Sequence, residues 1–383
     1  MCSERTIFAI AALFPVSSVD GVAAMADDRT LKDERDRSEV YLPSPTLSEL
    51  NAALTQRDDW EIRKSCPACS VPSIRRFASI RYISYERCDS CGFVFANPAP
   101  PTAVVSNFYN SDFYDNYRTL EETRIGEEPY FSVSAYTDPV RLAGWLKCDK
   151  SASILDFGCG SGSFVALLRD KFGFENVEGL ELNKKSASIA LRHYALELAL
   201  DINDLKQQQY DVVILFEVIE HITKPDEILS LCSRLLRPGG LLFLTTPSVR
   251  SIPGRYFPSH CGHYTGPSHV SLFTETALTR LLARFRFEIE RLEIDRNRSI
   301  LGNFVAKPVY NLDFASPRSR TDVNDALFSP NRFGRLLGLM PSRSIGPVFN
   351  RLRRLDGLMA RAFMKVTGRS FSDHLYVLAK KIS

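Results

Sequence analysis

The stretch Leu155-Asp-Phe-Gly-Cys-Gly-Ser-Gly-Ser163 decides the fold of this chain. It ends a short apolar segment typical of a buried strand, and the residues after it, Phe164–Leu168, are typical of the start of a helix. Its three glycines remove Cβ atoms where a backbone turns sharply near a ligand, and the helix presents free N–H groups. An acid, Asp156, stands where a phosphate-binding loop avoids negative charge. The stretch therefore predicts a nucleotide-type cradle for a ligand with a cationic or polar end.

The composition is that of an ordinary globular protein. The chain has 383 residues, of which 44% are hydrophobic and 24% charged, and this length predicts more than one structural unit. A formal net charge of +3 is small for such a chain, so no nucleic-acid partner is expected. The odd count of nine cysteines argues against a secreted disulfide framework, and a reducing, cytoplasmic location is expected.

The amino-terminal segment 1–60 is expected to be disordered or extended. Its apolar run, Ile7–Val16, has about half the length that spans a bilayer, and its flanks weakly resemble those of a signal peptide. Residues 26–40 carry many charges and few large apolar groups, which is typical of disorder. The alternatives to secretion are a disordered tail and a true start at Met25 instead of Met1.

Four cysteines predict a zinc ribbon within residues 61–97. Cys66 and Cys69 form one C-x-x-C pair, and Cys88 and Cys91 form a second pair further along the chain. This spacing is typical of a tetrahedral zinc site, in which each turn directs two thiolates at one metal ion. Because four protein ligands leave no open coordination position, we expect a structural zinc ion, with a small hairpin between the two pairs.

Two further segments accompany the predicted core. Residues 98–146 are crowded with aromatic side chains, which form either a helical cap packed on the core or part of an acceptor pocket. Residues 296–371 combine arginines with apolar residues, which predicts two amphipathic helices in a basic insertion. These helices either pack on their own domain or contact an anionic membrane surface through residues 330–365.

Strands and helices alternate from Ser153 onward, which predicts a parallel sheet covered on both faces. The segment Arg237–Gly240 is expected to be a turn that ends a helix and opens the fifth strand, and His374–Lys380 to return as a strand beside Phe287–Ile294. The other expected strands are Ser153–Phe157, Asn176–Leu182, Leu196–Leu200, Tyr210–Phe216 and Gly240–Thr245. The expected helices are Ser163–Lys171, Lys184–Tyr194, Lys224–Leu236 and Thr274–Arg284.

A second acid, Glu181, ends the second expected strand. In a doubly wound fold, an acid at this position accepts hydrogen bonds from the ribose hydroxyls of a nucleoside ligand. With LDFGCGSG, GLEL, YDVVILFEVIEH, LLRPGG and LLFLTTPS, the chain resembles class I S-adenosylmethionine-dependent methyltransferases. The pattern is most similar to the ubiquinone-biosynthesis-like group, in particular to members with an amino-terminal zinc ribbon that often modify sugars or cell-surface polysaccharides.

The resemblance implies an α/β, Rossmann-like core formed by residues 147–295 and 372–383. This core would hold seven strands, the last of them antiparallel, with S-adenosylmethionine lying across the carboxyl ends of the strands. The adenine contact stays open, because the pattern after the third strand is poor. The cofactor-binding residues that the resemblance implies are Asp156, Gly158, Gly160, Glu181 and Phe216.

Methyl transfer is a displacement at a carbon that the sulfonium already activates, so the protein must mainly align the acceptor and remove its proton. Glu217, Glu220 and His221 are spaced i, i+3 and i+4 where a strand meets a helix, so they are expected to share one face, and His269 to return to it. Three interpretations stay open. They are a magnesium-type site of carboxylates and imidazoles, metal-free catalysis with His221 or His269 as general base, and a structural role in which Glu220 and His221 cap a helix.

The expected activity is methyl transfer to a small molecule or glycan, with O-methylation favoured. C-methylation of a nucleotide-linked sugar is one alternative, and a non-catalytic binding protein built on the zinc ribbon is another. The loop 259–269 is expected to bind the acceptor or to lie on the surface. The sequence names neither the acceptor, because this fold places specificity in variable caps and loops, nor the oligomeric state.

Overall fold

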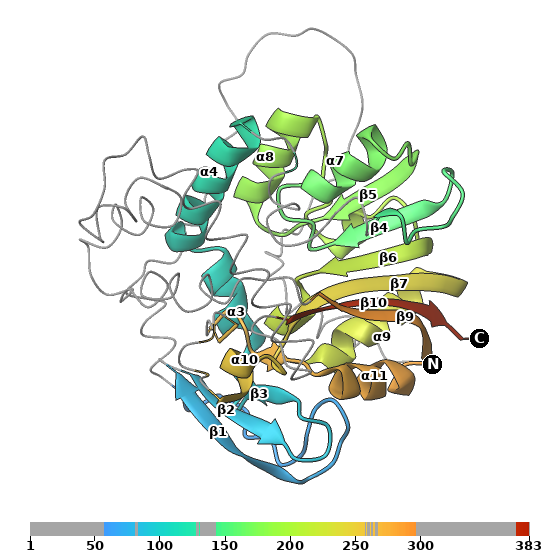
Figure 1. The fold of residues 1–383 in the computed structure, drawn as a ribbon. Helices are drawn as coiled ribbons and strands as arrows, with labels where there is room; N and C mark the ends of the chain where they lie inside the picture. The colour runs from blue at the N-terminus through green and yellow to red at the C-terminus, as the bar shows by residue number, and fades with distance from the viewer. Residues whose placement is uncertain are drawn as a thin grey trace, which may run out of the picture.

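The computed structural model describes residues 57–80, 83–127, 130, 143–256, 258, 261, 263–264, 267–295 and 373–382. The expectations for residues 1–56 and for the basic insertion 296–371, including membrane contact through 330–365, lie outside these residues. Figure 1 shows a large sheet flanked by helices and a small sheet next to it. In the described part of the chain, no helix combines the length and the hydropathy of a membrane span.

The large sheet has the strand order β5-β4-β6-β7-β10-β9. Neighbouring strands from β5 to β7 run parallel, whereas β10 is antiparallel to both of its neighbours. The carboxy-terminal strand therefore returns beside the strand that begins at Phe287, as predicted. The strands are β4 (Ser153–Phe157), β5 (Asn176–Leu180), β6 (Tyr210–Phe216), β7 (Leu236–Ser248), β9 (Phe287–Asp295) and β10 (Asp373–Lys381).

The described residues place six strands in this sheet, one fewer than the seven expected. The expected third strand, Leu196–Leu200, contributes a single bridge between Ala199 and Leu180. Ala199 exchanges two backbone hydrogen bonds with the end of β5, to Gly179 and from Glu181, each 2.9 Å long. Pairing stops there, so the segment follows the sheet edge without forming a strand.

The expected turn Arg237–Gly240 lies inside β7, and the prediction that it precedes the strand was wrong. β7 already pairs with β6 at Leu236, and the register then shifts so that Val212 faces Leu241. The extra residues form a bulge, in which Gly239 takes a φ of +77°. The glycines that suggested a turn are therefore absorbed by the strand.

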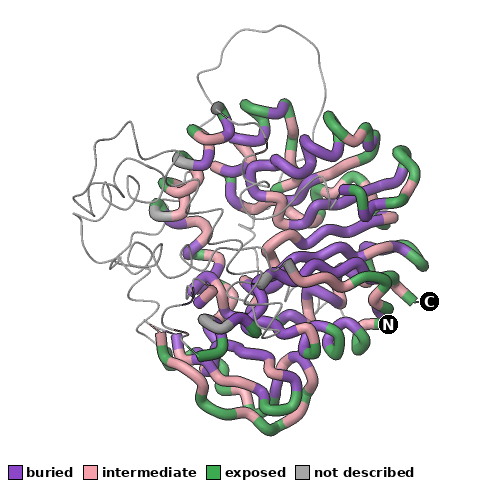
Figure 2. The backbone as a smooth tube through the Cα atoms, in the orientation of Figure 1, coloured by how far each residue is buried: buried purple, intermediate pink, exposed green. Residues whose placement is uncertain are grey.

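The two faces of the large sheet bury alternate residues, as a strand period of two requires. Leu155, Val213 and Leu244 point to a cluster that includes α9 (Pro225–Leu235) and α11 (Glu275–Arg284). Ile154, Ile214 and Phe243 point to the other face, which α7 (Ser163–Asp170) covers. Both faces are buried, and Figure 2 shows this burial running along the central strands. The next helix, α8 (Lys184–Tyr194), contacts α7. Three short helical segments complete the described core: η1 (Ile202–Asp204), η2 (Ile219–His221) and α10 (Ile252–Tyr256).

Two helices, α3 (Thr102–Tyr109) and α4 (Asp112–Glu127), lie where an aromatic cap is expected. α4 lies beside α8 (Figure 1). The small sheet contains β1 (Ile74–Ile80), β2 (Ile83–Cys88), β3 (Val94–Ala96) and β8 (Ser271–Leu272). β1, β2 and β3 precede the strands of the large sheet in the sequence, whereas β8 follows β7. The small sheet therefore combines the amino-terminal segment with a segment of the core.

Candidate active site

The loop between β4 and α7 needs its glycines. Gly158, Gly160 and Gly162 have φ values of +75°, +57° and +73°, a region that L side chains rarely adopt. A Cβ on Gly158 would lie 2.8 Å from Cγ2 of Val218, and a Cβ on Gly160 would lie 3.3 Å from the guanidinium of Arg118. The loop is therefore held close to side chains from two other elements.

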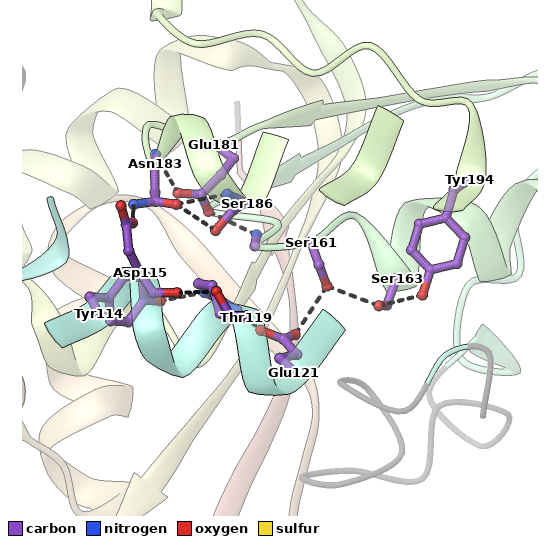
Figure 3. A network of polar contacts seen from close by, with 12 residues as sticks. Tyr114, Asp115, Thr119, Glu121, Ser161, Ser163, Glu181, Asn183, Ser186 and Tyr194 are labelled. Carbon is purple, nitrogen blue, oxygen red and sulfur yellow. Dashed lines mark hydrogen bonds and ion pairs between the residues drawn. The ribbon is translucent and has the colours of Figure 1, made fainter. Parts of the chain in front are cut away.

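The carboxylate of Glu181 ties the end of β5 to this loop. Its Oε2 accepts a hydrogen bond from the backbone N–H of Gly160, and its Oε1 accepts one from the backbone N–H of Asn183, each 2.8 Å long (Figure 3). The Asn183 side chain caps α8 and also donates to the carbonyl of Tyr109 at 3.0 Å. The acid expected at the ribose thus lies next to the glycine loop.

Asp156 is buried at the carboxyl half of β4, with an exposed fraction of 1%. Its Oδ1 has no hydrogen-bond partner among the described residues. Burial, and then the charge of Glu181, raise the pKa of Asp156 to about 7. A buried carboxylate without a donor is costly, so this oxygen fits a cationic ligand group.

A third charged residue, which the sequence analysis missed, lies over the loop. Arg118 is on α4. Its guanidinium forms an ion pair with Glu121 and donates a hydrogen bond to the Tyr114 hydroxyl. Its Nε has no partner among the described residues, although its side chain is only 13% exposed. Glu121 in turn accepts a hydrogen bond from the Ser161 hydroxyl at 3.0 Å, so α4 is fixed to the loop (Figure 3).

Glu217 and Glu220 follow β6 but have different surroundings. Glu217 has a φ of +52°, and its Oε1 accepts a hydrogen bond from Thr245 Oγ1 at 2.9 Å. Glu220 is fully buried, and its Oε2 accepts a hydrogen bond from Thr246 Oγ1 at 3.0 Å. Burial raises the pKa of Glu220 well above its usual value, and the charge of Glu217 adds to this. Oε1 of Glu220 has no hydrogen-bond partner among the described residues.

His221 and His269 meet, as the sequence predicts, with ring centroids 4.8 Å apart. Nδ1 of His221 lies 2.6 Å from the Tyr109 hydroxyl and 2.8 Å from the Ser268 carbonyl. Nδ1 of His269 donates to the carbonyl of His263 at 2.8 Å, because a carbonyl only accepts. Burial lowers the pKa of His221, and it lowers that of His269 to about 3.

A histidine that contacts Glu217 was not among the expected site residues. His374 is the second residue of β10, and its Nε2 lies 3.2 Å from Oε2 of Glu217. Phe216, expected to face the cofactor, ends β6 and packs against Phe164 and Phe243, with centroids 4.5 and 5.2 Å away. Its contact with a cofactor stays a prediction.

Glu220, His221 and His269 have ligand atoms within 4.8 Å of one another. One carboxylate and two imidazoles do not fit Mg²⁺, which prefers oxygen ligands in an octahedral arrangement. Glu217, the second carboxylate of the magnesium interpretation, is not in this group. The described residues therefore do not fit a catalytic magnesium ion.

The four cysteines that predict a zinc ribbon have their sulfur atoms close together. The Sγ atoms of Cys66 and Cys91, and those of Cys69 and Cys88, are each 3.6 Å apart, and all four lie within 4.8 Å of one another. Tetrahedral bonds of about 2.3 Å to zinc place sulfur atoms roughly 3.8 Å apart, so the geometry fits that ion. The hydrogen bond between Cys66 and Cys91 lowers the pKa of Cys91 to about 5 and raises that of Cys66.

Only part of the loop 259–269 is described. Tyr264 is buried, donates to the carbonyl of Gly254 at 2.8 Å and meets the Tyr85 ring edge-on at 5.3 Å. The Tyr264 ring therefore packs against β2 of the small sheet. An acceptor-binding role for the loop stays a prediction.

The strand order, the glycine loop and the acids at the ends of β4 and β5 are the features that the resemblance to class I S-adenosylmethionine-dependent methyltransferases implies. In agreement, residues 134–292 match the family described as a methyltransferase domain.

Individual proteins that are similar in sequence to this chain are also named as methyltransferases. The chain is 33% identical over 103 residues to a ubiquinone biosynthesis O-methyltransferase of Shewanella pealeana, covering 24% of this chain and 42% of that protein. It is 28% identical over 143 residues to the one of Hydrogenovibrio crunogenus, covering 34% and 58%. The chain thus spans about half the length of the curated relatives that it matches.

Among solved structures, the chain is similar to an O-methyltransferase from a polyketide multienzyme of Brevibacillus brevis in complex with S-adenosyl-L-homocysteine. The sequence identity is 15% and the TM-score 0.40, with 70% of this chain and 79% of that one covered.

Proposed function

We propose that this chain is an S-adenosylmethionine-dependent methyltransferase that methylates a hydroxyl group of a small molecule or glycan. One observation carries the cofactor assignment. Two buried polar atoms of opposite charge type, Oδ1 of Asp156 and Nε of Arg118, have no hydrogen-bond partner among the described residues. Both belong to residues that border the glycine loop, so the site suits a ligand that carries an ammonium and a carboxylate together.

The methionine part of S-adenosylmethionine is such a zwitterion. Asp156 would hold its ammonium group, Arg118 its carboxylate and Glu181 the ribose hydroxyls. When bound, the cofactor supplies a methyl carbon that is already activated by the sulfonium. The glycine loop leaves room for it because Gly158 and Gly160 have no Cβ atoms.

The acceptor would bind on the other side of the methyl group, near the carboxyl ends of β6 and β7. Tyr109, His221 and His269 lie there, and the ring of His221 lies 5.3 Å from that of Tyr109 and 4.8 Å from that of His269. Because burial lowers the pKa values of both histidines, they are neutral near pH 7 and act by hydrogen bonding and shape. Their task is to align the acceptor hydroxyl with the methyl carbon.

We further propose a structural zinc ion at Cys66, Cys69, Cys88 and Cys91. The ribbon is joined to the core through α11, since Thr274 Oγ1 donates to the Cys91 carbonyl at 2.6 Å and Arg284 donates to the Pro67 carbonyl at 2.7 Å. Folding of the ribbon is thereby coupled to the position of α11.

The test is methyl transfer from labelled S-adenosylmethionine to separate pools of nucleotide sugars, glycolipids and quinone precursors. The proposal expects label in one pool, and none with the Asp156→Asn variant. Nuclear magnetic resonance of the product then separates an O-methyl group from a C-methyl group on a nucleotide-linked sugar. No label in any pool, together with no cofactor binding, would support the non-catalytic binding protein instead.

A further inference from the structure

The inference concerns His374, and it rests on the proposed methyl transfer. His374 is the second residue of β10 and pairs with Pro247 in β7 and with Asp295 in β9. Because β10 is antiparallel to β7, its first residues lie at the carboxyl edge of the parallel strands, where Glu217 follows β6. The last strand of the chain thus brings an imidazole to the edge where the acceptor is expected.

The contact with Glu217 fixes which nitrogen of His374 carries a proton. Nε2 lies 3.2 Å from Oε2 of Glu217, and an ionised carboxylate only accepts, so Nε2–H donates. Glu217 is itself held, because its Oε1 accepts a hydrogen bond from Thr245 Oγ1 and its backbone N–H donates to the Thr245 carbonyl at 3.1 Å. This contact favours the tautomer with the proton on Nε2 and orients the ring.

The other ring nitrogen is left for a ligand. With a proton on Nε2, Nδ1 of the neutral ring bears a lone pair, and it has no hydrogen-bond partner among the described residues. His374 is only 3% exposed, and its ring meets that of His263 edge-on at 5.5 Å. A buried acceptor of this kind calls for a donor such as a substrate hydroxyl.

The two histidines expected from the sequence are less suited to take a proton. Nδ1 of His221 already lies within hydrogen-bond distance of Ser268 and Tyr109, and its Nε2 is 3.8 Å from Oε1 of Glu220. Burial lowers the pKa of His269 to about 3, so it holds a proton weakly. A carboxylate in contact with an imidazole, in contrast, stabilises the imidazolium that proton transfer creates.

We propose that His374 is the general base of the methyl transfer and that Glu217 is its positioning residue. As the acceptor oxygen bonds to the methyl carbon, the carbon–sulfur bond breaks and its electron pair stays on sulfur. The proton of the acceptor hydroxyl passes to Nδ1 of His374, while Nε2–H stays hydrogen-bonded to Glu217. The acceptor is accordingly a neutral hydroxyl compound, whose proton must leave during the reaction.

The first test is His374→Gln. The amide nitrogen of glutamine takes the place of Nε2 and keeps a donor for Glu217, but nothing replaces the Nδ1 lone pair. We expect kcat to fall about 10²- to 10⁴-fold, with the affinity for S-adenosylmethionine unchanged in calorimetry. The matched control is His193→Gln, whose imidazole lies 3.3 Å from Glu122. His193 belongs to α8, a helix far from β10 in the fold (Figure 1), so wild-type kcat is expected.

A double-mutant cycle provides the second test. Glu217→Gln removes the charge that stabilises the imidazolium, so it should lower kcat as well, and the double variant should be no slower than His374→Gln alone. The inference is overturned if His374→Gln keeps wild-type kcat, if it weakens cofactor binding as much as it lowers kcat, or if the two losses multiply. Wild-type protein in the same assay separates this failure from that of the proposed function, because the latter leaves the wild type without methyl transfer.

Discussion

The backbone N–H of Gly160 donates to Oε2 of Glu181 at 2.8 Å, so the glycine loop after β4 and the acid after β5 contact each other directly. A second backbone N–H, that of Asn183, holds the other oxygen of the same carboxylate. The carboxylate is thus oriented before any ligand binds, which lowers the entropic cost of binding a ribose there. Its neighbours Asp156 and Arg118 complete a site with both signs of charge.

Replacement of Asp156 by asparagine should stabilise the protein without cofactor at neutral pH. The folded-state pKa of about 7 lies above the ordinary aspartate value of 3.8, so the folded protein keeps a proton that the unfolded chain loses. Stability is therefore lost as the pH rises from about 4 to about 7, and asparagine avoids this loss. Thermal unfolding should show an advantage for Asp156→Asn of on the order of 1 kcal/mol or more at pH 7.5 and little at pH 4.5. An advantage that is equal at both pH values would contradict this account.

Cofactor affinity should rise with pH below about 7. The ammonium group binds the ionised form of Asp156, and only a minor fraction is ionised well below a pKa of about 7. Calorimetry between pH 5.5 and 7.0 should show the dissociation constant of S-adenosylmethionine falling, by at most about tenfold per pH unit. An affinity that is flat over this range would argue against Asp156 as the partner of the ammonium.

Arg118→Met should weaken binding of the zwitterion and spare the nucleoside. We expect about 10- to 100-fold weaker binding of S-adenosylmethionine, because one charge-assisted contact is lost. Methylthioadenosine, which lacks the amino acid part, should bind wild type and variant equally well. The matched control is Arg237→Met, which removes an exposed ion pair with Asp211 near the start of β6. An equal loss of affinity for both ligands would mean that Arg118 acts only by anchoring α4.

Gly158→Ala should cost more stability than Gly173→Ala. Both glycines have positive φ, +75° and +69°, so both variants carry about 1 kcal/mol of backbone strain. A Cβ at Gly173 meets nothing within 4 Å, whereas a Cβ at Gly158 collides with Val218. Chemical denaturation should show the extra destabilisation at Gly158 alone, and Val218→Ala should relieve part of it. Equal losses at the two glycines would show that the loop shifts freely.

Purified protein should contain one zinc ion per chain. Cys69→Ser or Cys88→Ser should lose it and unfold at lower temperature, because metal binding stabilises the ribbon and its contacts with α11. Cys148→Ser, outside the cluster, should keep both the zinc and the unfolding temperature. Elemental analysis and thermal unfolding check this prediction. A purified protein that contains no zinc and is as stable as the zinc-loaded protein would refute the proposed zinc site.

Local patterns explain what the sequence could predict. The glycine loop and Glu181 are read from short motifs with fixed spacing, and strand alternation gave the element order, including the return of the last strand. Arg118 and His374 were missed because they come from α4 and β10, and only the fold brings them to the loop and to Glu217. No spacing rule links residues so far apart in sequence.

Two local predictions failed for a different reason. Arg237–Gly240 has the composition of a turn, but β7 pairs with β6 both before it, at Leu236, and after it, at Leu241, so these residues form a bulge inside the strand. Leu196–Leu200 has the composition of a strand, but it pairs only at Ala199. In both cases the presence or absence of strand partners in the fold, and not local composition, decides whether a strand forms.

Calorimetric titration of the purified chain with S-adenosylmethionine tests the central claim most directly, with the Asp156→Asn and Arg118→Met variants alongside. The account predicts binding of one cofactor per chain to the wild type, with affinity clearly reduced in both variants. Absence of binding by the folded, zinc-loaded wild type, or equal binding by all three proteins, would contradict it.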